Sequence, residues 1–301
     1  MTDADPHRVI ADHGSAVNGV SCTADGRILS AGFGGAPVRG ALHQVKLWSR
    51  TGETLGGFGS GTRVVCHYAA MSPDGRTVAA GLGDLTVRLW DTTSNEVLTL
   101  GSLGGIVASL AWSADGKTLF TGNCGDNTVR LWDVAAARVI AAGKTKKSAT
   151  WEVALSPDGA RGVSGSGDKL VHVWQPGAGA EVGALAGHTG KILCLRFSPD
   201  GRLVASASQD RTARVWDIAS GNPVGVLNGH RKQVTGVAFF PDGARVATTS
   251  GDRTIRVWTT DGQLLRSLAT GAPLVESIAI APDGAEIIAG GADGRVRGFA
   301  V

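Results

Sequence analysis

Histidine, aspartate and serine are the residues of this sequence that could support acid–base or nucleophilic chemistry, and several recur at fixed spacing. An aspartate stands six residues before an aromatic residue at Asp84, Asp126, Asp168, Asp210, Asp252 and Asp293. Out of context, Asp210 and His230 resemble groups of a catalytic site. Because equivalent groups recur along the chain, a structural role has to be weighed against a catalytic one.

Compact enzyme motifs are missing from the sequence in a strand–turn–helix setting. Gly165-Ser166-Gly167-Asp168-Lys169 resembles a phosphate-binding loop only superficially, because it lies in an expected hairpin turn with no helix behind it. No two of the seven histidines have metal-ligand spacing, and the four cysteines form no Cys-x-x-Cys pair. We therefore expect no catalytic residue, no metal site and no cofactor.

Composition narrows the class of protein further. The 301-residue chain has a net charge of +3 and one tyrosine, which argues against nucleic-acid binding. No apolar stretch approaches the roughly 20 residues that span a bilayer, and the acidic N-terminus does not resemble a secretory signal. Cys22, Cys66, Cys124 and Cys194 are expected to be free thiols of a cytoplasmic protein. Abundant Ala, Gly, Val and Arg suggest a high-GC bacterial gene.

An internal repeat of 42 residues organises the whole chain. Tryptophans mark it at Trp48, Trp90, Trp132, Trp174, Trp216 and Trp258, and Phe299 follows in the same context. An Asp-Gly pair runs in phase at Asp25, Asp74, Asp115, Asp158, Asp200, Asp242 and Asp283. Seven repeats are expected, over approximately 12–49, 59–91, 102–133, 144–175, 187–217, 229–259 and 270–301.

Each repeat contains four strand-like segments. In the sixth repeat they are Val234–Phe240, Arg245–Thr249, Thr254–Trp258 and a weaker run, Gln263–Leu268, separated by turn residues. Four short strands per repeat make one blade of a β-propeller. The sequence therefore predicts an all-β protein of one domain, residues 1–301, folded as a single seven-bladed propeller with four antiparallel strands per blade.

The two ends of the chain are expected to close the ring. The last repeat stops at Val301, directly after its third strand, and an apolar segment precedes the first repeat. We expect residues 7–11 to supply the missing fourth strand of the last blade, which would leave no long exposed edge and would make the chain a complete ring.

The repeat resembles the WD40 family over essentially residues 7–301. The Trp-Asp pair stands at Trp90, Trp132 and Trp216, and the Gly-His pair ends at His188 and His230; other blades lack one or both. The resemblance implies a hydrogen-bonded tetrad in the fifth and sixth blades. Its members would be His188, Ser206, Asp210 and Trp216, and His230, Thr248, Asp252 and Trp258. Buried polar groups need such partners, so these residues are expected to be structural. Blades 1, 2 and 7 would depend more on apolar packing.

The resemblance also implies a non-catalytic scaffold that binds a protein or peptide on the face called the top, which carries the loops before the first strand and between the second and third strands. The first repeat has seven extra residues there, within Gly32–Gln44, including Phe33, Arg39 and His43. Such a loop either carries function or is a harmless insertion.

Basic residues form a second candidate surface on the top of blades 4 to 6. They are Lys146, Lys147, Lys191, Arg231 and Lys232. They either attract an acidic partner or are ordinary solvated side chains.

The position seven residues before each turn aspartate varies from blade to blade. It holds Asn18, His67, Ala108, Trp151, Leu193, Thr235 and Glu276. Trp151 is either an interface anchor beside the basic residues or is buried between blades.

The leading expectation is a monomeric platform for other proteins, including acidic peptide segments, without nucleic acid or membrane. The alternative is a propeller enzyme or small-ligand binder with a site at the mouth of the central channel.

Overall fold

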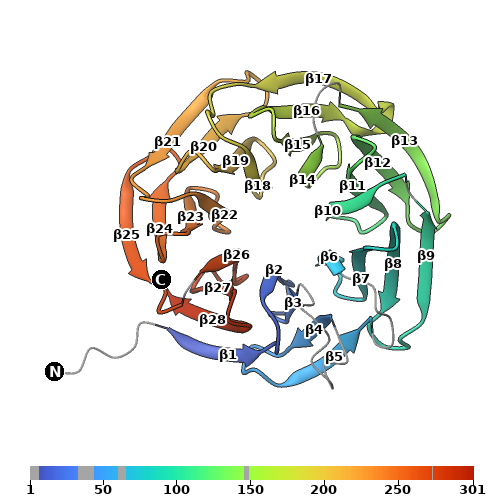
Figure 1. Ribbon diagram of the computed structural model, residues 1–301, viewed down its shortest axis with the longest axis horizontal. Coiled ribbons are helices and arrows are strands. Elements are labelled where there is room, and N and C mark those ends of the chain that lie inside the picture. The colour runs from blue at the N-terminus through green and yellow to red at the C-terminus, as the bar shows by residue number, and fades with distance from the viewer. Residues whose placement is uncertain (1–6, 33–43, 60–65, 103, 146–148, 273) are drawn as a thin grey trace.

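The computed structural model describes residues 7–32, 44–59, 66–102, 104–145, 149–272 and 274–301. Within these residues the strands form seven four-stranded antiparallel sheets, arranged as blades around a central axis (Figure 1). The expected seven-bladed propeller is therefore confirmed. The described residues contain one short helical element, η1 (Pro176–Ala178), in the fourth blade.

The strands follow one another outward from the axis in each blade. Blade 1 consists of β2 (Val17–Cys22), β3 (Ile28–Gly32), β4 (Val45–Trp48) and β5 (Thr54–Phe58), and blade 2 of β6 (Cys66–Met71), β7 (Thr77–Leu82), β8 (Thr86–Asp91) and β9 (Val97–Ser102). Blade 3 consists of β10 (Ile106–Trp112), β11 (Thr118–Cys124), β12 (Thr128–Asp133) and β13 (Arg138–Lys144), and blade 4 of β14 (Thr150–Leu155), β15 (Gly162–Ser166), β16 (Val171–Gln175) and β17 (Ala180–Leu185). Blade 5 consists of β18 (Ile192–Phe197), β19 (Leu203–Ser208), β20 (Thr212–Asp217) and β21 (Pro223–Asn228), and blade 6 of β22 (Val234–Phe239), β23 (Arg245–Ser250), β24 (Thr254–Thr259) and β25 (Leu264–Ala269).

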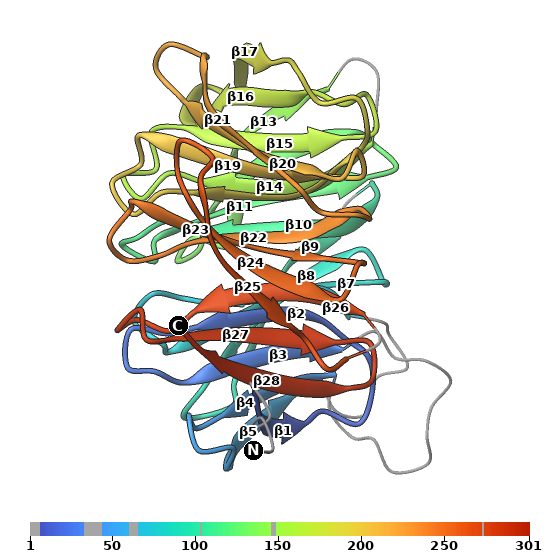
Figure 2. The same cartoon turned by 90° about the vertical axis from the view of Figure 1, so that its left-hand side faces the viewer.

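The seventh blade is built from both ends of the chain. Its strands are β26 (Val275–Ile280), β27 (Glu286–Gly291), β28 (Arg295–Ala300) and, outermost, β1 (Arg8–Asp12). Strand β1 pairs antiparallel with β28, with Arg8 opposite Gly298 and Asp12 opposite Arg295. The two strands lie side by side in Figures 1 and 2. Closure of the ring by the N-terminal segment is thus confirmed.

The repeated Asp-Gly pairs make the turns between the first and second strands of the blades. In blade 6, Asp242 accepts hydrogen bonds from the backbone N–H of Ala244 and Arg245, and Gly243 has a φ of 67°. Glycine adopts this left-handed conformation without steric cost. The carboxylate and the glycine together explain why this dipeptide recurs once per blade.

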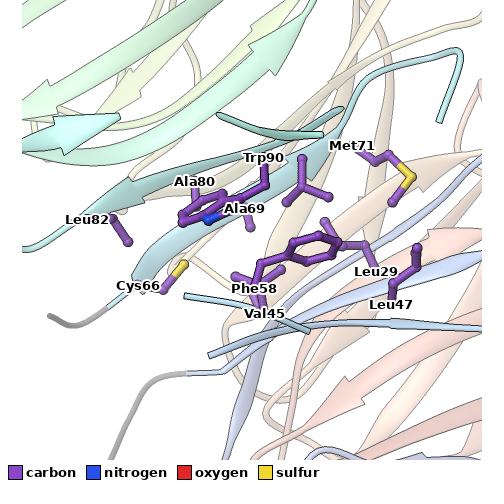
Figure 3. Packing of buried hydrophobic residues seen from close by; sticks show 12 residues of the cluster. Leu29, Val45, Leu47, Phe58, Cys66, Ala69, Met71, Ala80, Leu82 and Trp90 are labelled. Carbon is purple, nitrogen blue, oxygen red and sulfur yellow. The ribbon is translucent and has the colours of Figure 1, made fainter. Parts of the chain in front are cut away.

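The apolar core lies between neighbouring blades. Figure 3 shows one such cluster, in which Leu29, Val45 and Phe58 of blade 1 pack with Cys66 and Trp90 of blade 2. Each repeated aromatic residue lies in a cluster shared with another blade: Trp48, Trp90, Trp132, Trp174, Trp216, Trp258 and Phe299. The 42-residue spacing therefore records a packing requirement between blades, because each large ring fills one interface.

Every innermost strand carries a β-bulge near its start. The register shifts leave one residue of each strand without a direct partner: Asn18, His67, Ala108, Trp151, Leu193, Thr235 and Glu276. A bulge re-aims the side chain of the extra residue. This shared backbone feature explains why one repeat position accepts such varied residues. The seven residues lie around the top end of the central channel and are called the bulge ring below.

Candidate functional site

The fifth and sixth blades each bring a histidine, a hydroxyl, an aspartate and a tryptophan together. In blade 5, His188 Nδ1 lies 2.7 Å from Asp210 Oδ2, and His188 Nε2 lies 2.8 Å from Ser206 Oγ. The indole N–H of Trp216 donates to the same Ser206 Oγ at 2.8 Å. These hydrogen bonds between four side chains thus connect the top loop of the blade to its third strand.

Blade 6 repeats this arrangement with threonine in place of serine. His230 lies 2.9 Å from Asp252 and 2.8 Å from Thr248 Oγ1, which accepts the indole N–H of Trp258 at 2.8 Å. The His188 and His230 side chains are almost fully buried. The Ser206 and Thr248 side chains are fully buried, so no substrate can reach either hydroxyl.

Burial and hydrogen bonding set the protonation of these groups. Burial lowers the pKa of His188 and of His230, so both rings are neutral at pH 7. Burial raises the pKa of Asp210, but hydrogen bonds from Thr212, the Thr189 backbone N–H and His188 outweigh it and bring the pKa to about 2. An ionised aspartate accepting from a neutral histidine is a stable pairing for a structural network.

Blades without the Gly-His pair use a different partner for the same aspartate. In blades 2, 3 and 7 the arginine two residues before the repeated aromatic forms an ion pair with the aspartate. The pairs are Arg88 with Asp84, Arg130 with Asp126 and Arg297 with Asp293. His172 occupies that position in blade 4 and contacts Asp168 at 3.0 Å. Blades 2 and 7 therefore gain an ion pair that the sequence analysis, which left them to apolar packing, did not foresee.

Blade 1 keeps part of the network. His13 Nδ1 lies 2.7 Å from Ser30 Oγ, which also accepts the indole N–H of Trp48 at 2.7 Å. Burial and the nearby Lys46 charge lower the pKa of His13 to about 4. This histidine is therefore neutral at physiological pH, like those of blades 5 and 6.

The aspartates of the two tetrads also hold the top loops that carry basic residues. Asp210 Oδ2 accepts the backbone N–H of Thr189, two residues before Lys191, and Asp252 Oδ2 accepts that of Arg231, each at 2.9 Å. Lys191, Arg231 and Lys232 are exposed, and the described residues give them no ion pair. The tetrads thus fix the backbone of the loops from which these unpaired basic side chains project.

Trp151 lies at the bulge of β14 with 49% of its surface exposed. Of the two alternatives for this residue, burial between blades is excluded, and the side chain is available on the top face. Strand β14 neighbours β18, and Lys191 immediately precedes β18 in the chain (Figure 1). Candidates Phe33, Arg39, His43, Lys146 and Lys147 lie outside the described residues.

A polar cluster inside the channel was missed by the sequence analysis. Arg196 Nη1 donates to Glu152 Oε1 at 2.7 Å, and Arg196 Nη2 donates to the Tyr68 hydroxyl at 2.9 Å. The three residues come from blades 5, 4 and 2, so the contact crosses the channel. Self-comparison of the repeats carries a signal for it: six blades have a small residue at the Arg196 position, namely Ser21, Ala70, Ala111, Ala154, Ala238 and Ala279.

Burial dominates the electrostatics of this cluster. It raises the pKa of the Glu152 carboxyl, while the Arg196 guanidinium pulls that pKa back down. Burial likewise raises the pKa of Tyr68, which keeps its hydroxyl protonated. The cluster is therefore an ion pair between Glu152 and Arg196, with the neutral Tyr68 hydroxyl as a further hydrogen-bond partner of the guanidinium.

Other reactive groups are buried or scattered. The four cysteines are free, and burial raises the pKa of Cys22 and of Cys66 to about 12, which makes them poor nucleophiles. In the part of the chain that the structure describes, no three His, Cys, Asp or Glu side chains gather as metal ligands would. No helix among the described residues has the length and apolar character needed to cross a membrane.

Comparisons with known proteins agree with the fold. No curated protein matches the chain. A chain of the solved structure described as "Crystal Structure of Mitotic Checkpoint Complex" superposes with a TM-score of 0.85 at 20% identity, over 99% of this chain and 92% of that one. The repeat family described as WD domain, G-beta repeat matches residues 53–91, 94–133, 143–175, 179–217, 221–259 and 262–299. These matches cover more than half of the sequence, and the protein belongs to the WD40-repeat family.

Proposed function

We propose that this protein is a non-catalytic scaffold that binds an acidic protein segment across the top of blades 4 to 6. WD40 propellers generally bind other proteins and are generally not enzymes. The observation that carries the proposal is the half-exposed Trp151 on blade 4 together with exposed basic residues on the top loops of blades 5 and 6, which the tetrads hold in place. Exposed tryptophan and arginine are typical anchors of interfaces.

The charges and the tryptophan have different parts in this proposal. Lys191, Arg231 and Lys232 raise the rate at which an acidic partner arrives and give the interaction its salt dependence. Trp151 supplies affinity when the partner covers it and removes its surface from water. The tetrads do not contact the partner; they hold the loops in place.

An enzyme or small-ligand site at the channel mouth remains the second candidate. The observation that favours it is the cluster of Tyr68, Glu152 and Arg196 across the channel. Its carboxylate and guanidinium neutralise each other, and no nucleophile lies against a base there in the described residues. The cluster therefore supports binding at the channel more than it supports catalysis.

Charge reversal tests the proposed surface. The triple variant Lys191→Glu, Arg231→Glu and Lys232→Glu is expected to weaken binding of the partner, captured from the cells that make the protein, by about tenfold or more at low salt. The melting temperature should change little, since surface substitutions usually cost within about 0.5 kcal/mol each. Affinity is measured by surface plasmon resonance over a range of salt concentrations.

The matched control places the same charge change on the opposite face. Lys117, Arg161 and Arg202 are exposed and follow the Asp-Gly turns of blades 3, 4 and 5. Their triple reversal to glutamate should leave binding unchanged. Loss of binding in this control, with normal binding by the top-face variant, would move the interface to the other side of the disc.

A further inference from the structure

A small chamber lies in the channel just below the bulge ring. Its volume is about 110 Å³, and its polar lining comes from Asn18, Tyr68, Glu152, Arg196, Thr235, Glu276 and Ser277. Asn18, Leu193, Thr235 and Glu276 are bulge residues, so the bulges of four consecutive blades, 5, 6, 7 and 1, contribute to its wall. The chamber adjoins a larger, mostly apolar cavity of about 390 Å³ in the channel, and Val20, Tyr68, Arg196 and Ile278 line both.

Two residues of the chamber lining each have a side-chain polar atom that is shielded from solvent and lacks a partner. Asn18 Oδ1 and Ser277 Oγ make no hydrogen bond to any described residue. Leaving a shielded polar group unpaired is unfavourable, so such groups normally face a water or a ligand. Asn18 Oδ1 can only accept a hydrogen bond, and a serine hydroxyl can accept one as well. A hydrogen-bond donor would therefore satisfy Asn18 Oδ1, and it could satisfy Ser277 Oγ as well.

The charges of the chamber point the same way. Arg196 is the one cationic side chain among its lining residues, and its guanidinium already binds Glu152, the Leu195 carbonyl and Tyr68. Glu276 is half-buried and has no ion pair among the described residues. Burial, with no cation to offset it, raises the pKa of Glu276. A cation placed against Glu276 would supply the counter-charge that this carboxyl lacks and would favour its ionised form.

Size limits the occupant. Pockets for drug-sized ligands hold about 300–1,000 Å³, so this chamber is too small for one. At about 30 Å³ per water it holds three or four waters, or the end of a single side chain.

We propose that the chamber receives the cationic head of one side chain of the bound partner, a primary ammonium or a guanidinium, against Glu276 and Asn18. This inference rests on the proposed function, since bulge residues at the top end of the channel line the chamber. The partner segment would then carry one basic residue over the channel and acidic residues over blades 4 to 6. A segment of acidic residues alone would leave the chamber filled with water and would bind less tightly.

Small probes test the chamber without the partner. The full-length protein is titrated with n-butylammonium and N-butylguanidinium, with neutral n-butanol for comparison, and followed by NMR at the backbone amides of Gly19 and Ser277. Both cations should shift these resonances and n-butanol should not. Glu276→Gln should weaken cation binding at least tenfold, and Asn18→Leu should weaken it severalfold. Glu96→Gln, an exposed glutamate beside the outer strand of blade 2, is the control and should bind normally.

The expected and contrary results are separable from those of the proposed function. An aspartate-rich peptide with one central lysine should bind at least tenfold more tightly than the same peptide with norleucine in its place, and Glu276→Gln should abolish the difference. Equal binding of the two peptides, of butanol and butylammonium, or of wild type and Glu276→Gln would show a chamber that holds water only and would overturn the inference. Normal binding of the lysine peptide by the triple charge-reversal variant would instead overturn the acidic-partner proposal and leave the chamber standing. Melting curves of each variant establish that it is folded.

Discussion

Removal of residues 1–11 is expected to lower the melting temperature by about 10 °C or to cause aggregation. Strand β1 covers the outer edge of blade 7, buries Ile10 and Ala11, and pairs Arg8 with Glu286 at 2.7 Å. Lost apolar burial and ladder hydrogen bonds together amount to about 5 kcal/mol, which corresponds to roughly 10 °C in a domain of this size. The freed edge of β28 would also be open to pairing with other chains.

Two point variants separate the contribution of the strand from the effect of truncation. Ile10 is 7% exposed and Val9 is 49% exposed: Ile10 lies at a bulge of β1 and packs in the apolar cluster that also contains Trp48, whereas Val9 faces solvent. Ile10→Ser should therefore destabilise by about 2–4 kcal/mol, and Val9→Ser by less than about 1 kcal/mol. A truncated protein that melts like the full-length chain would refute closure of the ring by β1 as a stabilising feature.

Asp252→Ala is expected to destabilise the protein by about 2–4 kcal/mol, and Asp210→Ala by a similar amount. Asp252 is 6% exposed at its side chain and accepts hydrogen bonds from Thr254 and from the Arg231 backbone, besides its contact with His230. Alanine would leave a buried imidazole and a loop N–H unpaired. Asp242→Ala in the same blade removes a side chain that is 39% exposed, and it should cost no more than about 1 kcal/mol.

The same tetrads predict how stability depends on pH. The folded-state pKa of Asp210 is about 2, below its unfolded value near 4, so its contribution is complete above pH 4 and is lost as the pH falls toward 2. His188 and His230 also have lowered pKa values and destabilise the fold when acid protonates them. The Asp210→Ala and Asp252→Ala variants should accordingly lose less stability between pH 4 and pH 2 than wild type. A variant that kept full stability yet lost partner binding would contradict the structural role of the aspartate.

The fold was predictable because each repeat states the same physical requirement. The spaced aromatics each fill one interface between blades, and the Asp-Gly pairs each make a turn that needs a left-handed residue. Seven copies of these signals in phase leave one architecture. The closing strand was predictable as well, because Val301 follows the third strand of its blade and residues 7–11 have no other partner.

The polar details of individual blades were less predictable. In some blades arginine replaces histidine as the partner of the repeated aspartate. This requires the arginine side chain to contact the aspartate four residues before it, as Arg88 contacts Asp84. In blades 5 and 6, where histidine takes the aspartate, the equivalent Arg214 and Arg256 lie over Trp216 and Trp258 instead. One sequence pattern thus has two conformations, and only the presence of the histidine decides between them.

The channel cluster and the bulge ring could not be predicted from the sequence, for a geometric reason. Tyr68 and Arg196 are 128 residues apart and meet only because the ring closes. The variety of residues at the bulge position was visible in the sequence, but the shift in register that turns them toward the channel was not. The sequence allowed Trp151 to be either buried or exposed, and the bulge in β14 is what places its side chain on the surface.

Hydrogen exchange with and without the captured partner tests the central claim, that binding occurs on the top face over blades 4 to 6. Exchange should slow in residues 149–153, 187–192 and 229–234, which include Trp151 and the loops held by the tetrads. Exchange should be unchanged in the opposite turns, residues 158–161, 200–203 and 242–245. Protection of those opposite turns, with no change around Trp151 and the loops of blades 5 and 6, would contradict the claim.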